Sequence, residues 1–444
     1  MIFALPHGCA GTASPITLVQ GLNTPRTTDP DWDAVIIGGG PAGSTAATVL
    51  ARAGRRVLVL EKAKFPRFHI GESLLPYNRE IFESLGVWEK IARAGFMKKR
   101  AAQFIMGNGS HANRLEFSTG AFTEYSEAIQ VERATFDQIL LDHSRESGAE
   151  VREGCLVTAR QIHADRAVVS YRSANGNAHQ IHARFLIDAS GMGNFTAIQE
   201  AGRKFYDGHR KVAIFGHFRG VKMPTGNEEG DILIIRRENS WVWMIPVSPD
   251  KTSVGLVIDA TRFRSSGDTP EQAFNLAVHS TPAVSHRFFH AERLEDLHVL
   301  ADFSYRNKTL VSPRVVRVGD ASGFIDPMFS SGILLAMLSA RQGAEAINQA
   351  LDTSQAITSG MRQYEKDNRR RIAVYWEFIE NFYRLHFTQL FFQPCNKWGL
   401  VCAVNSILAG RTDLSFAVWW RLRLFFFLVW LNRHVPVAKR IEIS

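Results

Sequence analysis

The chain shows three successive patterns of hydrophobic and polar residues. Residues 33–61 contain an apolar run, a helical stretch and a second apolar run, which predicts a strand, a helix and a second strand. Apolar runs of the same kind end near residues 191 and 320. Apolar and polar residues alternate in short runs over about 205–301, as in an antiparallel sheet. A helical period begins near residue 335, so the sequence predicts an α/β protein with a helical C-terminal region.

These patterns divide the chain into three regions. Residues 1–31 contain several prolines and threonines, and we expect a disordered N-terminal extension there. Residues 32–350 are expected to form a nucleotide-binding domain, interleaved with an antiparallel-sheet substrate domain at about 205–301. Residues 351–444 are expected to form helices that cover the substrate site.

The segment from Leu414 to Leu431 is rich in aromatic and apolar residues. Arg421 and Arg423 interrupt it, and no uncharged run approaches the ~18 residues that a membrane-spanning helix needs. We therefore predict no transmembrane segment, and expect an aromatic-rich helix that is buried against the core. Weak association of this helix with a membrane surface is the alternative.

Composition narrows the classes of partner. Of the 444 residues, 45% are hydrophobic and 21% are charged, which is typical of a globular protein. The formal net charge of +9 and the pI near 9.5 favour an acidic carrier protein, an anionic lipid surface or an anionic cofactor. Since the basic residues are scattered and no nucleic-acid motif is present, we expect no nucleic acid partner.

The cysteines and the first residues indicate the compartment. Cys9, Cys155, Cys395 and Cys402 have no CxxC spacing and are expected to be reduced thiols. His69 has no ligand-type spacing around it, so we expect no metal site. The first thirty residues lack a basic region followed by an apolar one. Without a secretory signal, a cytoplasmic location is expected.

A glycine-rich turn at residues 38–43 predicts a dinucleotide site. It follows a predicted strand and opens a helix, and Glu61 ends the next strand. In this arrangement Gly38 permits the tight turn, Gly40 lets the backbone approach a pyrophosphate, and Gly43 lets helix and strand pack closely. The helix N-terminus, which includes Ala42, offers free N–H groups to phosphates. The carboxylate of Glu61 suits the hydroxyls of an adenosine ribose.

Further segments identify the dinucleotide by resemblance. Phe65-Pro66-Arg67, Gly71–Pro76, Gly319-Asp320-Ala321 and Asp326-Pro327 occur in this order, with Arg133 between the second and the third. Together they resemble the FAD-dependent monooxygenase and halogenase superfamily. The resemblance implies a Rossmann-type FAD-binding domain, with Asp320 near the ribityl chain and pyrophosphate. It also places Pro327 at the isoalloxazine edge and Arg133 beside the flavin.

Two motifs narrow the resemblance to the flavin-dependent halogenases. The first is Trp241-x-Trp243-x-Ile245-Pro246, and the second is Phe-x-x-Pro-x-x-Ser-x-Gly over residues 324–332. The likeness runs from about residue 32 into the C-terminal helices. It implies that FADH2 and O2 form a flavin C4a-hydroperoxide, which oxidises chloride or bromide to hypohalous acid. The tryptophan motif is thought to keep the organic substrate away from the flavin.

The resemblance also implies halide and catalytic residues. Backbone N–H groups of Ser331 and Gly332 are expected to line the halide position, with Ile333 next to the flavin. A lysine carries the hypohalous acid to the substrate in this family. The matching segment places it at Lys99, with Lys98 as the alternative if the alignment slips by one residue.

One position narrows the expected substrate. Tryptophan halogenases have a glutamate where this chain has Phe329. We therefore expect an electron-rich aromatic such as a phenol or pyrrole, either free or tethered to an acyl or peptidyl carrier protein. A second dinucleotide motif is not found, so a separate flavin reductase is expected to supply FADH2. The alternatives are a flavin monooxygenase or a prenyl-chain reductase on the same fold, or a degenerate FAD-binding scaffold.

Overall fold

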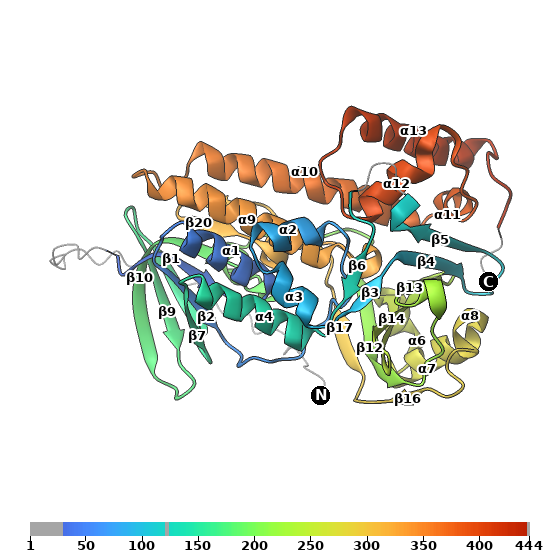
Figure 1. Cartoon of the computed structure of the whole chain (residues 1–444), viewed down its shortest axis with the longest axis horizontal. Helices are drawn as coiled ribbons and strands as arrows, with labels where there is room; N and C mark the ends of the chain where they lie inside the picture. Colours follow the sequence, from blue (N-terminus) through green and yellow to red (C-terminus); the bar gives the residue numbers. More distant parts are fainter. Residues whose placement is uncertain (1–29, 120–123, 442–444) are drawn as a thin grey trace.

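The computed structural model describes residues 30–119 and 124–441. The expected N-terminal extension, with Cys9, lies outside these residues, apart from its last two. A mixed sheet forms one side of the molecule (Figure 1), with strand order β19-β20-β10-β1-β2-β7 and with β8 and β9 extending it from β10. Its strands are β1 (Trp32–Ile37), β2 (Val57–Glu61), β7 (Glu150–Glu153), β8 (Leu156–Ile162), β9 (Ala167–Arg172), β10 (Ala178–Asp188), β19 (Val311–Ser312) and β20 (Val315–Arg317).

The predicted strand–helix–strand start is confirmed. β1 pairs with both β2 and β10 in parallel. Its residues 34–37 are buried because helices or strands cover both faces of the sheet. Helix α1 (Pro41–Arg52) begins within the glycine-rich turn. Its first residue is a proline, whose fixed φ suits a helix start.

Helices cover one face of this sheet. α1 packs against α9 (Gly332–Leu351) through alanine-rich surfaces of both helices, which lets the two backbones approach closely. The remaining helices of this half are α2 (Asn78–Ser84), α3 (Trp88–Arg93), α4 (Arg133–Glu146) and α5 (Phe195–Gln199).

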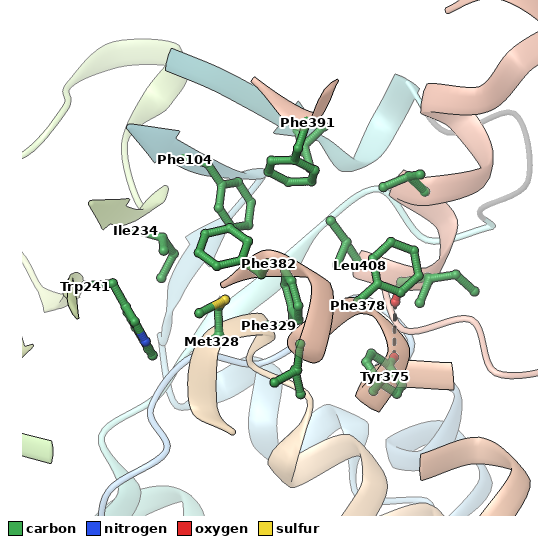
Figure 2. Close-up of a cluster of buried hydrophobic side chains, with 14 of the residues drawn as sticks. Phe104, Ile234, Trp241, Met328, Phe329, Tyr375, Phe378, Phe382, Phe391 and Leu408 are labelled. Atoms are coloured by element: carbon green, nitrogen blue, oxygen red, sulfur yellow. Dashed lines mark hydrogen bonds between the residues drawn. The ribbon is translucent and has the colours of Figure 1, made fainter. Parts of the chain in front are cut away.

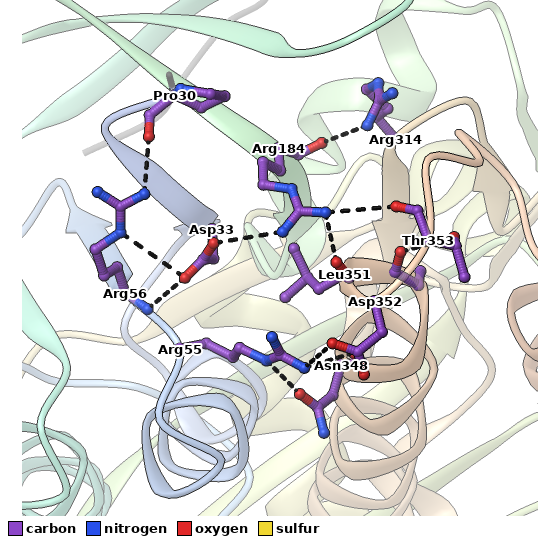
Figure 3. A network of polar contacts seen from close by, with 11 residues as sticks. Pro30, Asp33, Arg55, Arg56, Arg184, Arg314, Asn348, Leu351, Asp352 and Thr353 are labelled. Carbon is purple, nitrogen blue, oxygen red and sulfur yellow. Dashed lines mark hydrogen bonds and ion pairs between the residues drawn. The ribbon is translucent and has the colours of Figure 1, made fainter. Parts of the chain in front are cut away.

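Polar contacts hold the C-terminal end of α9 to the sheet (Figure 3). Arg55 Nε donates to Asn348 Oδ1 at 2.6 Å, and its Nη2 pairs with Asp352 Oδ1 at 2.7 Å. Arg184 on β10 donates to the carbonyl oxygen of Leu351. The helix is therefore fixed at this end to β10 and to the segment before β2, the two strands that flank β1.

The second large sheet has the order β16-β12-β15-β14-β13-β4-β5, with β17 beside β12. It differs from the expectation in three ways: it includes β4 and β5 from residues 101–116, its β13–β4 pair is parallel, and helices interrupt residues 260–285. Pairing between strands so distant in sequence leaves no local pattern. The elements are β4 (Ala101–Met106), β5 (Ala112–Glu116), β12 (Lys211–Arg219), β13 (Ile232–Arg236), β14 (Ser240–Ser248), β15 (Lys251–Asp259), β16 (Glu292–Arg293), β17 (His298–Ala301), α6 (Ala260–Ser266), α7 (Pro270–Ser280) and α8 (Pro282–Ser285).

The two faces of this sheet pack against different helices. Val242 and Met244 of β14 face the helices α7 and α8, whereas Trp241, Trp243 and Ile245 face the opposite way, as the two-residue period of a strand requires. Small strand pairs complete the fold: β3 (Met97–Lys99) with β6 (Ala128–Gln130), and β18 (Tyr305–Asn307) with β11 (Arg203–Phe205) and β21 (Gly323–Phe324).

The C-terminal helices pack on the tryptophan-bearing face of the second sheet. Figure 2 shows Phe104 from the sheet beside Phe382 and Phe391 from the helices, with Trp241 at the edge of the same cluster. α13 is the outermost of these helices (Figure 1). The helices are α10 (Ser359–Phe382), α11 (Leu385–Phe391), α12 (Leu400–Leu408) and α13 (Phe416–His434).

The prediction of a buried aromatic helix near the C-terminus is half correct. Val418, Leu422 and Val429 of α13 are buried against the aromatic core. Phe416 and Trp430, in contrast, are exposed on the opposite face. The sequence shows a nearly continuous apolar run here, and only the packing partners decide which face is covered.

Candidate active site

One cavity of about 600 Å³ connects the two sheets. It extends from the carboxyl ends of β1 and β2 to β14. Most of the residues predicted to bind the cofactor, the halide or the substrate line it: Gly38, Gly40, Ala42, Glu61, Arg67, Arg133, Asp320, Pro327, Gly332, Ile333, Trp241, Trp243 and Ile245. Four of the predicted residues, Gly43, Lys99, Pro246 and Ser331, are not part of its lining.

Two positions of the glycine-rich turn, Gly38 and Gly43, have no room for a side chain. A Cβ at Gly43 would lie 1.8 Å from the carbonyl oxygen of Gly38, and one at Gly38 would lie 2.5 Å from that of Ala189. Gly38 also has a φ of +99°, which favours glycine. Glu61 accepts from the Gly39 N–H at 2.7 Å, so the carboxylate is fixed beside the turn. The N-terminus of α1 follows and points its free N–H groups at the cavity.

A buried cation lies on the cavity wall. Arg133 forms two hydrogen bonds with Asp137, at 2.9 and 2.8 Å, and donates to the carbonyl oxygen of Ile70. Arg67 also pairs with Asp137, at 3.2 Å. Asp137 therefore orients two arginines that face the same cavity. The charge of Arg133 also acts on Asp320, which lines this cavity: burial raises the pKa of Asp320 to about 6, and the charge of Arg133 opposes this increase.

The N-terminus of α9 reaches the middle of the cavity. Asp326 caps the preceding turn by accepting from the Met328 N–H at 3.0 Å, and Ser330 takes a left-handed φ of 55°. This turn brings Gly332 and Ile333, the first residues of α9, to the cavity. Unpaired N–H groups at a helix start attract anions.

The Trp-x-Trp motif closes one side of the cavity. Trp241 and Trp243 are buried with their ring centroids 5.8 Å apart. Trp243 donates to Ser253 Oγ at 3.2 Å, and a Cβ at Gly255 would lie 2.2 Å from its ring. Pro246 continues the strand beside Thr252. Glycine at 255 thus gives the indole of Trp243 its place over the neighbouring strand.

Lys99 is buried beside the cavity. Its side chain is 1% exposed, and Nζ donates to Ser73 Oγ at 2.9 Å and to the Leu74 carbonyl oxygen at 3.1 Å. Ser73 lines the cavity, so one hydroxyl lies between the amine and the cavity. Burial lowers the pKa of Lys99 to about 7, against the opposing charge of Asp231. The neighbouring Lys98 is exposed and pairs with Glu127 at 3.2 Å.

Tyr383, just beyond the end of α10, connects two motifs. It accepts from Trp241 Nε1 at 2.9 Å and donates to Asp326 Oδ2 at 3.0 Å. Burial raises the pKa of Asp326 to about 6, while its hydrogen bonds with the Met328 N–H and Tyr383 oppose the increase. Sequence reasoning missed Tyr383, because no local signal connects it to residues 57 and 142 positions away.

His217 lies between two carboxylates. One ring nitrogen contacts Glu72, which lines the cavity, and the other contacts Glu295 at 2.7 Å. Burial alone would lower the pKa of His217, but the hydrogen bond and charge of Glu72, together with the charge of Glu295, raise it above the ordinary value. Protonated His217 would therefore hold a positive charge between Glu72 and Glu295 at the cavity wall. No local pattern in the sequence marks His217 or Glu295 as part of a site.

Phe329 is not part of the cavity lining. Its ring packs within 6.1, 6.2 and 5.9 Å of Phe104, Phe378 and Phe382, measured between ring centroids, as Figure 2 shows. Phe329 is thus part of the aromatic core between the sheet and the C-terminal helices. This position weakens the expectation that the residue at 329 determines which aromatic ring reacts.

The residues present fit FAD. A Cβ at Gly40, which lines the cavity, would meet only Arg67 Nη2 at 3.4 Å, so the backbone here is open to a ligand. Glu61 at the edge of the turn suits ribose hydroxyls. The same cavity continues to Ile333 and the start of α9, where the expected isoalloxazine end would lie. Gly38, Gly40 and Arg67 would hold the pyrophosphate end, and FAD would bring redox chemistry with dioxygen to the site.

Comparisons with known proteins give the family. Residues 31–379 match the FAD binding domain family. A 1H-pyrrole-2-carbonyl-[peptidyl-carrier protein] chlorinase of Pseudomonas fluorescens is 32% identical over 384 residues, which are 81% of this chain and 85% of that protein. The chain belongs to the flavin-dependent halogenases.

Other relatives support the same conclusion about this halogenase. A tryptophan 2-halogenase of Chondromyces crocatus is 32% identical over 79% of this chain and 68% of that protein. The solved structure of the myxobacterial chondrochloren halogenase CndH is 32% identical, with a TM-score of 0.74, and covers 89% of this chain and 97% of that one. The predicted fold and FAD-dependent enzyme class are therefore confirmed. Within residues 30–119 and 124–441, no helix of the halogenase is both long and apolar enough to cross a bilayer.

Proposed function

We propose that this halogenase uses FADH2 and O2 to chlorinate or brominate an electron-rich aromatic compound such as a phenol or pyrrole. The observation that carries the proposal is the single cavity that joins the glycine turn, the start of α9 and the Trp-x-Trp strand. Reduced FAD would supply the electrons with which dioxygen oxidises a halide. The chain's residues would bind the halide, retain the hypohalous acid and direct it to the ring.

Chloride or bromide would bind at the N-terminus of α9. Ser331 is the N-cap and Gly332 the first residue of a helix of 20 residues, whose dipole favours an anion at their backbone N–H groups. Ser331 Oγ is buried and has no hydrogen-bond partner within the described residues. Neutral backbone donors hold a halide without the strong pairing that a lysine or arginine would impose.

Lys99 is the proposed catalytic residue. Its pKa of about 7 leaves a fraction of the amine neutral near pH 7, ready to react with hypohalous acid. The protonated fraction can instead donate a hydrogen bond that activates the acid. The contact with Ser73 supports transfer across the cavity wall, whereas Lys98 points to the surface.

The substrate would enter beside the second sheet and the C-terminal helices. We assign residues 32–350 to FAD binding and the interleaved substrate domain, and residues 351–444 to covering the substrate site. The aromatic core between them supports this division. The named chlorinase acts on a carrier-bound pyrrole, and the positive net charge suits an acidic carrier protein. The substrate is therefore proposed to be free or carrier-tethered.

The source of FADH2 and the location of the enzyme in the cell are also part of the proposal. A separate flavin reductase would supply FADH2, since the sequence has one dinucleotide motif. The enzyme would act in the cytoplasm, where NADH-dependent reductases and reduced cysteines are found.

The test supplies the protein with FAD, a flavin reductase, NADH, O2 and bromide. Phenols, pyrroles and tryptophan are offered free, and pyrroles also on a carrier protein, with products identified by mass. A bromine isotope doublet is expected with the wild type and with Lys98→Ala. It should be absent with Lys99→Ala and Lys99→Met, while both variants still bind FAD.

Other products would contradict the proposal. One added oxygen without halogen would indicate a monooxygenase, and two added hydrogens would indicate a prenyl-chain reductase. Halogenated product from Lys99→Met would overturn the role of Lys99. FAD binding without any turnover would indicate a scaffold.

A further inference from the structure

The outermost C-terminal helix exposes a row of large aromatic side chains. Phe416, Trp419, Phe427 and Trp430 of α13 are 77, 46, 52 and 55% exposed, and we call them the aromatic stripe. With 3.6 residues per turn, these positions lie on one face of the helix and extend over about 21 Å. The opposite face packs on the aromatic core, so the stripe faces away from the protein.

The stripe consists of two stacked pairs of rings. Phe416 and Trp419 stack with ring centroids 6.0 Å apart, and Phe427 and Trp430 stack at 5.7 Å. Between the two pairs, Arg423 is held by Glu377 of α10 at 2.7 Å. Large apolar side chains gathered on one exposed helix face indicate a binding surface.

The charge around the stripe identifies the class of partner. Residues 383–444 contain eight lysines and arginines but only two acidic residues, Asp413 and Glu442, so they account for a net +6 of the formal +9. α13 itself contains no aspartate or glutamate. Arg433, Lys439 and Arg440 are exposed beyond the C-terminal end of the stripe. A partner for this face is therefore expected to be anionic.

We propose that the aromatic stripe and the basic residues around it bind the surface of an anionic lipid membrane. Tryptophan and phenylalanine insert readily at the level of lipid headgroups, and nearby lysine and arginine attract anionic lipids. A second copy of the chain fits less well, because it would bring a second strongly basic surface against the first. Spanning the membrane is excluded by Arg421 and Arg423 within the helix.

The FAD-loaded full-length protein is mixed with vesicles of phosphatidylcholine alone or with added phosphatidylserine, at low and high salt. Sedimentation with the vesicles measures binding, and a blue shift of tryptophan fluorescence reports insertion. We expect binding to the anionic vesicles only, weakened by salt. The double variant Trp419→Ala/Trp430→Ala should bind at least about tenfold more weakly.

Phe289→Ala is the matched control, because Phe289 is 84% exposed but lies outside the stripe. It should bind the vesicles as the wild type does. FAD absorbance and the bromination rate without vesicles should be unchanged in both variants, which separates this proposal from the proposed function.

Three results would overturn the proposal. Equal binding to neutral and anionic vesicles would show that the basic residues do not contribute to membrane binding. Undiminished binding by the double variant would show that the aromatic stripe does not contribute. A dimer in light scattering that the double variant abolishes, without vesicle binding, would assign the face to a second copy. Binding of an acidic carrier protein that the double variant loses, again without vesicle binding, would assign it to that protein.

Discussion

Replacing Tyr383 by phenylalanine tests whether the C-terminal helices hold the active site in shape. The substitution removes one hydroxyl that joins two buried groups, Trp241 Nε1 and Asp326 Oδ2. A buried polar group that loses its partner costs about 1–3 kcal/mol, so the two together predict a loss of about 2–6 kcal/mol in unfolding free energy. Tyr375→Phe is the control, because its buried hydroxyl makes one hydrogen bond, to the Ile407 carbonyl oxygen at 3.1 Å, and should cost about 1 kcal/mol.

The effect of Tyr383→Phe should also depend on pH. The pKa of Asp326 is raised to about 6 in the folded protein, above its unfolded value of about 3.9. The folded state therefore binds more protons in this window, and its stability falls as the pH rises from about 4 to about 6. Loss of the Tyr383 hydrogen bond raises the folded pKa of Asp326 further, so the destabilisation should be larger at pH 8 than at pH 4.5.

Urea unfolding of the two variants and the wild type at both pH values is the assay. The reasoning is refuted if Tyr383→Phe costs no more than Tyr375→Phe, or if its cost is the same at both pH values. A confirmed difference would show that the indole of Trp241 is positioned from the C-terminal region.

The remaining predictions concern the cavity and its walls. Gly43→Val should abolish FAD binding in a flavin absorbance titration, because any Cβ there collides with the Gly38 carbonyl; a yellow, active variant would disprove this. Phe329→Glu should lower the unfolding free energy by about 3–5 kcal/mol by placing a carboxylate in the aromatic core, and stable protein with a wider product range would contradict it. His217→Gln should destabilise the protein more at pH 6 than at pH 9, since protonated His217 stabilises the fold until the pH rises through its elevated pKa. Equal urea midpoint shifts at both pH values would argue against a charged His217.

Local patterns were sufficient for the nucleotide-binding half. The order of strand, glycine turn and helix fixes the backbone around Gly38 and Gly43 by sterics alone, and these residues adopt the predicted arrangement. The two-residue period of β14 likewise places Trp241 and Trp243 on one face. Such features depend on neighbours in sequence, which is why a single sequence reveals them.

Contacts between distant segments were not predictable in this way. Tyr383 and His217 have partners more than fifty positions away, and no motif marks either residue. Phe329 was interpreted from its place in a motif, but its surroundings come from α10 and β4. The exposed face of α13 could not be predicted either, since an apolar run does not show which of its sides a neighbour covers.

The length of α9 has a consequence for how the enzyme can vary. Its first residues meet the cavity, and its last are tied to the first sheet through Asn348 and Leu351. One inserted residue would rotate one end against the other by about 100° and lengthen the helix by about 1.5 Å. Functional variants should therefore keep this helix free of insertions and deletions, and accept them after Asp352, where the chain leaves the helix. The length of α9 therefore fixes how its N-terminus is oriented in the cavity relative to the first sheet.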